Sequence, residues 1–364
     1  MLTIGMAGTA KNTGKTTAAT ALLAQAFRHG ITTGLTSIGL DGENLDNVTG
    51  LPKPRFVVAA GTRVAVAAGC LPVSEAVVEV TVATGVRTPL GEVLIGVVRH
   101  AGRLVLAGPN KRSELRRTLD RLQEASCRLA LVDGALNRMV PLVETDALIL
   151  STGAARSREA AVLAEETGVI AAALNLPAVL PGPPSAGIVL GDGDPTRASL
   201  LDPAQVRVTL GRVTRDVSYI SIPGIVEGGC LAALMEGLRP HAGGMTLVFG
   251  SALHLLVSCA PQTLHRLLTT WGEAGGRVAV CRRPDLLAVT VNPFYPDVDG
   301  QVVRPAYVDA MALEQALRQK VKVPVVDVVR SGTEALWRPV ESRLAREWGW
   351  SPVRRGRGRW SRRC

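Results

Sequence analysis

The sequence predicts an α/β fold in which a doubly wound parallel sheet is followed by a second α/β domain. Two observations support this prediction. Short apolar runs with strand character alternate with longer runs of helical spacing, and such alternation favours parallel strands joined by helices. Hydrophobic residues make up 47% of the 364 residues but aromatic residues only 3%, so the expected core consists of Ala, Val and Leu, as in strands buried on both faces.

The first predicted domain covers residues 1–182. It begins with a strand at 2–7, a polar turn and a helix over 14–29 that ends at Gly30. A strand at 32–38 and a loop follow. The later elements are expected to be a hairpin of 92–98 and 103–107, a helix at 114–125, strands at 128–132 and 146–151, and a helix at 157–167.

A second predicted domain covers residues 183–350, because four prolines between 176 and 184 mark a boundary near residue 182. It carries no recognisable chemistry and is assigned to the binding of a client or partner. Residues 351–364 form a basic tail. The expected elements of the second domain are strands at 217–222, 246–250 and 324–329, helices at 225–238, 261–274 and 308–319, and a hairpin of 277–281 and 286–291.

The formal net charge of +10, taken alone, points to nucleic acid or an anionic surface as partner. Six arginines lie within the last 14 residues, however, and account for more than half of that charge. We interpret this tail as a solvated extension rather than as a site for RNA, lipid or an acidic partner. Scattered cysteines without a C-x-x-C pair and the lack of an 18-residue apolar run predict a soluble, cytoplasmic protein that uses no specific nucleic acid and no membrane.

The strongest motif is the glycine-rich stretch between the first strand and the first helix. It matches the phosphate-loop pattern G-x-x-x-x-G-K-[ST] at its last three positions, while Thr9 stands at the first glycine position and Gly8 precedes it. Backbone N–H groups of such a loop bind phosphate oxygens, the lysine neutralises them and the hydroxyl after it binds Mg²⁺. We therefore expect ATP and Mg²⁺ as cofactors, with the nucleotide bound by Gly8, Asn12, Thr13, Gly14, Lys15, Thr16 and Thr17.

A phosphate loop also needs a carboxylate at the end of a second strand to hold Mg²⁺ or its water. Asp133 follows four apolar residues and fits this role, so Lys15 and Asp133 are the predicted catalytic residues and Thr16 and Asp133 the predicted metal ligands. Asp41 is a further metal candidate beside Glu43, although an ordinary Asp-Gly turn explains it nearly as well. Asp46 is a weaker candidate. The lack of an N-K-x-D signature favours ATP over GTP.

Several other residues have a functional and a plainer interpretation. Lys11 could reach the γ-phosphate across a dimer, but a solvent-facing loop lysine is favoured. Arg87 and Thr88 could sense the γ-phosphate or lie in a surface loop. Asn175 could contact a base or end an element. The stretch from Asn292 to Pro296 could bind a ligand, but a plain turn is favoured.

The stretch from Gly8 to Thr17 is similar to the cobyrinate a,c-diamide synthase and dethiobiotin synthetase branch of the P-loop proteins. Taken together, several segments resemble the reactivase subunits of lysine 5,6-aminomutase. Outside the phosphate loop these motifs are only modestly specific. They are Gly8–Thr17, Thr36–Glu43, Val132–Arg138, Val291–Pro293 and Val323–Val328.

The resemblance implies an accessory ATPase that reactivates a cobalamin-dependent aminomutase by promoting exchange of its damaged cofactor. It implies two partners, an ATPase similar to the mismatch-repair MutS proteins and the adenosylcobalamin-dependent aminomutase itself, and leaves a homodimer possible. Two alternatives stay open at this point. One is an ATP-dependent ligase or kinase acting on a small carboxylic acid, and the other is a nucleotide-gated binding module with little turnover.

Overall fold

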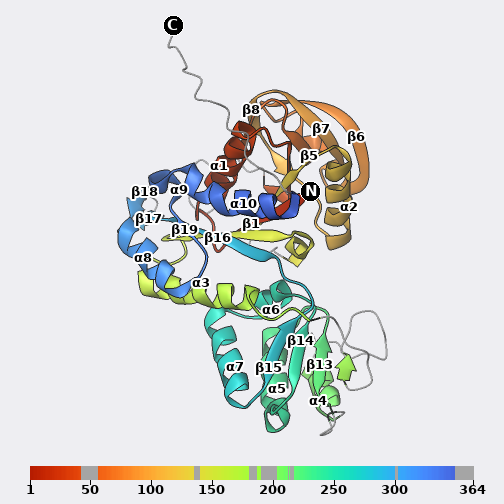
Figure 1. Ribbon diagram of the computed structural model, residues 1–364, viewed down its shortest axis with the longest axis vertical. Coiled ribbons are helices and arrows are strands. Elements are labelled where there is room, and N and C mark those ends of the chain that lie inside the picture. The colour runs from red at the N-terminus through yellow and green to blue at the C-terminus, as the bar shows by residue number, and fades with distance from the viewer. Residues whose placement is uncertain are drawn as a thin grey trace.

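The computed structural model describes residues 1–41, 56–134, 140–179, 187–189, 203–211, 213, 217–299 and 302–348. Its main feature is a nine-stranded sheet with helices on both faces, and a separate four-stranded sheet lies at the other end of the molecule (Figure 1). The predicted α/β class with a large, mostly parallel sheet is confirmed.

The nine-stranded sheet is parallel except for its last two strands, which form an antiparallel hairpin. β1 is central, and β10 and β11 flank it in parallel register. In spatial order the strands are β19 (Val325–Val326), β16 (Asp285–Asn292), β11 (Ala147–Gly153), β1 (Leu2–Gly8), β10 (Leu129–Asp133), β2 (Thr33–Ser37), β5 (Arg63–Ala67), β7 (Gly91–His100) and β6 (Val77–Thr88).

Both faces of this sheet are buried, which explains why its central strands read as continuous apolar runs. Along β11, Ala147 and Ile149 belong to one core cluster, whereas Leu148 and Leu150 belong to the other. One cluster is closed by α1 (Lys15–Arg28) and α10 (Thr333–Trp348), and the other by α2 (Arg112–Glu124), α3 (Ala160–Leu174) and α8 (Ala310–Lys320).

The four-stranded sheet is parallel throughout. The core cluster of α2 and α3 continues into it through Phe249 and Trp271, so the two sheets share one apolar interior. Its strands are β12 (Gly187–Val189), β13 (Tyr219–Ile222), β14 (Thr246–Phe249) and β15 (Arg277–Val280), accompanied by helices α4 (Pro203–Leu210), α5 (Gly228–Leu238), α6 (Ala252–Ser258) and α7 (Pro261–Glu273).

After β15 the chain returns to the nine-stranded sheet. β16 pairs with β11 and β19 pairs with β16, so the strands after residue 284 do not belong to the four-stranded sheet. The hairpin expected from 277–281 and 286–291 is therefore wrong, because the two runs lie in different sheets. The sequence predicts a division of the chain at residue 182, but β16 and β19 join the nine-stranded sheet, so these strands belong with the first part of the chain and not with the second. Apolar runs predict strands but carry no information about their partners.

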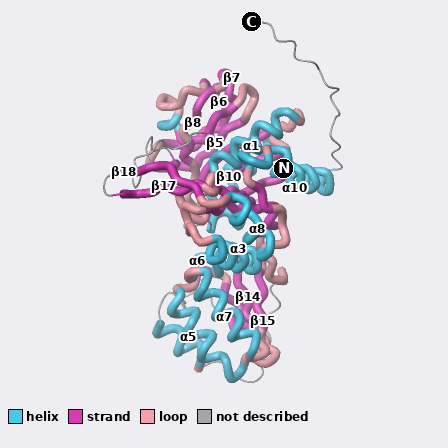
Figure 2. Tube along the Cα trace, turned by 90° about the vertical axis from the view of Figure 1, so that its left-hand side faces the viewer, coloured by secondary structure: helices cyan, strands magenta, loops and turns pink. Residues whose placement is uncertain are grey.

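The hairpin expected around residues 100–102 is also wrong. β7 pairs instead with β6, whose turn contains Gly91 at φ 96°, and β8 pairs with β4. The described residues also contain three short ribbons, of which β17–β18 projects from the body (Figure 2). They are β3 (Leu40–Asp41) with β9 (Leu106–Ala107), β4 (Phe56–Val58) with β8 (Gly102–Leu104), and β17 (Phe294–Asp299) with β18 (Val302–Tyr307).

Three short 3₁₀ turns, η1 (Ala68–Cys70), η3 (Val140–Glu144) and η5 (Arg239–His241), and the single turn α9 (Val328–Ser331) complete the described elements. None of the helices in the described part of the chain combines the length and apolarity that a membrane crossing requires. The expected basic tail, 351–364, lies outside the described residues.

Candidate functional site

The glycine-rich stretch forms the loop between β1 and α1, at the carboxyl end of the central strand. Met6 of β1 lies opposite Asp133, the last residue of β10, so the carboxylate predicted from sequence comes to the same edge of the sheet as the loop. Loops at the carboxyl ends of parallel strands are the usual ligand sites of open α/β sheets.

Two residues of the loop adopt left-handed backbone conformations. Asn12 has φ 62° and Gly14, which precedes α1, has φ 83°. Gly14 offers no side chain to cap the helix, and the first turn of α1 carries no acidic residue. The N–H groups that begin a helix have no acceptor within it, so this end of α1 is suited to an anion.

Gly8 is required by the close return of the loop. A Cβ atom at this position would lie 2.9 Å from the hydroxyl oxygen of Thr13, and that hydroxyl donates to the carbonyl oxygen of Ala10 over 3.0 Å. The loop therefore folds back on itself across Gly8, and any side chain there would displace Thr13.

Lys15 reaches across the loop to the end of β10. Its Nζ lies 2.7 Å from Oδ2 of Asp133 and 2.6 Å from the carbonyl oxygen of Gly134. The Lys15 side chain is 17% exposed and that of Asp133 only 2%. A buried carboxylate is stable only when charge and hydrogen bonds compensate it, and here Lys15 supplies both. The two residues predicted to be catalytic are thus in direct contact.

The hydroxyl groups after Lys15 make no hydrogen bond to another described residue. Thr16 is partly buried at the start of α1, and Thr17 is exposed. A hydroxyl and a carboxylate oxygen are the hard ligands that Mg²⁺ accepts, together with waters and phosphate oxygens. Thr16 and Asp133 therefore fit the predicted metal.

The remaining acidic candidates add little. The backbone of Asp41 lies in β3, paired with Leu106, but its side chain is not described, and Glu43 and Asp46 lie outside the described residues. Within the described ranges, no three His, Cys, Asp or Glu side chains gather into a group that could hold a metal ion.

Asn292, for which the sequence favoured a plain turn, contacts the loop directly. Its Nδ2 donates to the carbonyl oxygen of Asn12 over 2.8 Å, and its Cβ lies 3.4 Å from the position of a Cβ on Gly14. Asn292 ends β16, two strands from β1. The one sequence signal was a polar residue directly after an apolar strand, and the order of strands that gives it meaning is not written in the sequence.

Hydroxyl side chains join the start of the loop to β11 and join β11 to β16. Thr9 Oγ1 lies 2.9 Å from Thr152 Oγ1, and Thr290 Oγ1 donates to Ser151 Oγ over 2.8 Å. All four residues are buried. Buried hydroxyl pairs of this kind restrict the loop because breaking them leaves unpaired polar groups.

Of the four other candidates, Arg87, Thr88 and Asn175 lie away from the loop, and Lys11 lies within it. Arg87 and Thr88 end β6, five strands from β1 or about 24 Å at the usual strand spacing, so they cannot sense a phosphate bound by the loop. Asn175 ends α3, where its side chain donates to the carbonyl oxygen of Ala171. Lys11 is exposed in the loop.

A cluster of charged residues connects η3 and α2, which pack on the nine-stranded sheet, with the end of β15 in the four-stranded sheet. Glu144, whose side chain is 4% exposed, forms ion pairs with Arg112 and Arg116 of α2 and with Arg282, which follows β15 and whose Nη1 lies 3.6 Å from Oε1 of Glu144. Burial alone would raise the pKa of Glu144, but the hydrogen bonds and charges of Arg112 and Arg116 outweigh it and lower this pKa. Glu144 therefore stays ionised and joins three segments.

No protein-family model, no curated protein and no solved structure matches this chain.

Proposed function

We propose that the chain binds ATP with Mg²⁺ at the loop between β1 and α1 and hydrolyses it. The observation that carries the proposal is the 2.7 Å contact between Lys15 Nζ and Asp133 Oδ2. The carboxylate that a phosphate loop requires, sought in the sequence at the end of a second strand, lies beside the loop lysine at the carboxyl edge of a parallel sheet and at the start of a helix.

Each residue has a separate task in this proposal. The N–H groups at the start of α1 and the ammonium group of Lys15 hold the phosphate oxygens, since both supply positive charge in a fixed position. Thr16 and Asp133 hold Mg²⁺, which when bound neutralises charge on the β- and γ-phosphates. With nucleotide bound, Lys15 would exchange its contact with Asp133 for phosphate, and the buried Asp133 carboxylate would be compensated by the Mg²⁺ that it holds together with Thr16.

The test is to measure ATP binding and phosphate release for Lys15→Ala. We expect the variant to lose at least tenfold in ATP affinity, because a charge-assisted contact to phosphate disappears. Lys11→Ala is the matched control, since Lys11 is an exposed lysine of the same loop, and we expect its affinity to change little. Unaltered binding in Lys15→Ala would exclude this nucleotide site.

We further propose that ATP turnover serves the reactivation of a cobalamin-dependent aminomutase. Support comes from the resemblance of the loop and four further segments to the reactivase subunits, and from the shared core of the two sheets, which could carry a change at the loop to the distant end of the molecule. Release of a tightly held cofactor requires a conformational bias, which nucleotide binding and hydrolysis can supply. In this role the chain acts together with the MutS-like partner ATPase.

The deciding experiment mixes the chain and the MutS-like partner ATPase with lysine 5,6-aminomutase loaded with hydroxocobalamin and with fresh adenosylcobalamin, and it follows ATP turnover and recovered mutase activity. We expect both to rise with this chain and not with Lys15→Ala. If turnover appears only when a small carboxylic acid is supplied, the protein is instead a ligase or kinase. Tight ATP binding without turnover under any of these conditions would indicate a nucleotide-gated binding module.

A further inference from the structure

A cavity of about 650 Å³ lies at the edge of the nine-stranded sheet, between α8, β19 and α10. Its apolar wall includes Val321, Val325 and Pro339, and its polar rim includes Arg318 of α8 and Arg338 of α10. The volume is in the range of small-molecule sites. Three strand positions separate β19 from β1, about 14 Å at the usual spacing, so this cavity is distinct from the loop between β1 and α1.

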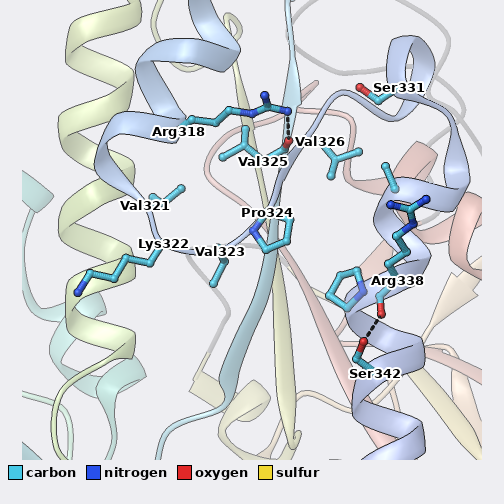
Figure 3. Close-up of a pocket in the computed structure, with 12 residues that line it drawn as sticks. Arg318, Val321, Lys322, Val323, Pro324, Val325, Val326, Ser331, Arg338 and Ser342 are labelled. Carbon is cyan, nitrogen blue, oxygen red and sulfur yellow. Dashed lines mark hydrogen bonds between the residues drawn. The ribbon is translucent and has the colours of Figure 1, made fainter.

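The charges that line the cavity are all positive. Figure 3 shows Arg318 of α8 reaching Val325 from one side of β19, while Arg338 lies on the other side, on α10, and the Lys322 side chain points away from the strand. No carboxylate is among the lining residues within the described part of the chain. Arg318 has an ion pair with Glu314 of its own helix, whereas Arg338 forms no ion pair with a described residue. The guanidinium group of Arg338 therefore leaves the rim of the cavity with a positive charge that no described carboxylate balances, and an anion would relieve it.

The backbone of β19 adds hydrogen-bonding groups to the same space. The N–H group of Val289 donates to the carbonyl oxygen of Pro324, which directs Pro324 and Val326 toward β16. In a parallel ladder the residue between them turns its N–H and C=O groups the other way. The weak bond of 3.5 Å from Arg318 to the carbonyl oxygen of Val325 agrees with this direction, so the N–H group of Val325 also faces the outer side of the strand.

We propose that this cavity binds a small organic anion, a phosphate or carboxylate group attached to an apolar portion. The planar guanidinium fork of Arg338 matches two oxygens of such an anion, Arg318 adds positive charge on the α8 side, and the N–H group of Val325 can donate to it. The apolar portion packs against Val321 and Pro339. A separate anion site with its own arginines does not depend on the nucleotide proposal.

The test measures binding of phenyl phosphate and of phenylacetate by titration calorimetry, using the full chain with Lys15→Ala so that the first loop contributes little. We expect saturable binding of at least one probe, and the stronger of the two identifies a phosphate or a carboxylate as the preferred group. Arg338→Gln should weaken this binding about tenfold, as expected for the loss of a bidentate charge-assisted contact. Arg338→Lys should recover part of it, since the charge returns without the fork.

Arg330→Gln is the matched control, because Arg330 is an exposed arginine close in sequence that does not line the cavity. It should bind the probes within about twofold of the parent, while added salt weakens binding in both. Two results would overturn the proposal. One is no saturable binding of either probe at millimolar concentration, and the other is equal binding by Arg338→Gln, Arg330→Gln and the parent.

Discussion

Asn292 donates from Nδ2 to the carbonyl oxygen of Asn12 over 2.8 Å, although the two residues are 280 positions apart in the sequence. Asn12 has a φ of 62°, a left-handed conformation that asparagine adopts more readily than most residues other than glycine. The contact helps to hold this conformation and with it the direction of the N–H groups that follow. The end of β16 is in this way a structural support of the loop between β1 and α1.

Removal of this support should weaken nucleotide binding without abolishing it. For Asn292→Ala we expect a roughly fivefold to tenfold rise in the Kd for ATP, since a single hydrogen bond contributes about 1 kcal/mol. Fluorescence titration with a labelled ATP analogue measures it. Asn175→Ala is the control, because Asn175 makes a comparable side-chain bond at the end of α3 but does not touch the loop. Equal Kd values for Asn292→Ala and the parent would contradict this role.

The carboxylate of Asp133 should matter for turnover more than for binding. Asp133→Asn keeps the size and an oxygen for Lys15 but removes the charge that holds Mg²⁺, so we expect Mg²⁺-dependent phosphate release to fall about 100-fold, a loss of roughly 2.7 kcal/mol of transition-state stabilisation. Metal-free ATP affinity should change by less than about threefold. Asp120→Asn, an exposed aspartate of α2, should leave both unchanged. A variant at Asp133 with full turnover would remove this residue from the metal site.

Alanine variants at Gly14 and Gly30 separate the effect of backbone strain from the effect of a steric contact with Asn292. Both have positive φ, 83° and 67°, but a Cβ on Gly14 would lie 3.4 Å from Asn292 whereas one on Gly30 meets nothing within 4 Å. Each alanine variant should lose about 1–2 kcal/mol of unfolding free energy in denaturant titrations. Only Gly14→Ala should also lower ATP affinity. If Gly30→Ala lowers it equally, the effect at Gly14 is one of global stability.

The ion pairs of Glu144 should make part of the stability depend on pH. Because the pKa of Glu144 is lowered in the folded chain, its contribution is complete above its ordinary value of 4.5 and is lost as the pH falls through the folded-state pKa. Glu144→Gln should therefore reduce the free energy of unfolding by about 1–2 kcal/mol at pH 7 and by much less near pH 3. Urea titrations at both pH values measure this. A loss of equal size at the two pH values would mean that charge is not the cause.

Cys127 should be unreactive until the chain unfolds. Burial raises the pKa of its thiol to about 11, although the charge of Arg63 opposes this, so about one molecule in a thousand carries the thiolate at pH 8. Iodoacetamide at pH 8, followed by peptide mass analysis, should modify the half-buried Cys281 first and Cys127 only in guanidinium chloride. Alkylation of both at the same rate would show that the region around Cys127 opens readily.

The sequence predicted where helices and strands lie better than it predicted which strands pair with each other. The apolar runs 277–281 and 286–291 were recognised as strands, but they were paired with each other because local alternation is the same whichever sheet a strand joins. The glycine at position 102 predicts a hairpin turn at 100–102, whereas the structure forms the hairpin between β6 and β7, beside Gly91. Strand pairing depends on long-range packing, which a local pattern does not contain.

For the candidate site, the sequence alone determined those residues that belong to a local motif or directly follow a strand. Lys15, Thr16 and Asp133 were found because phosphate and metal chemistry restricts residue types over a short stretch beside one strand and one helix. The tertiary structure alone decided that Lys15 touches Asp133, that Asn292 supports Asn12, and that Arg318 and Arg338 share a cavity across β19. These contacts follow from the order of strands in the sheet, and that order is set by burial of both faces at once rather than by any local preference.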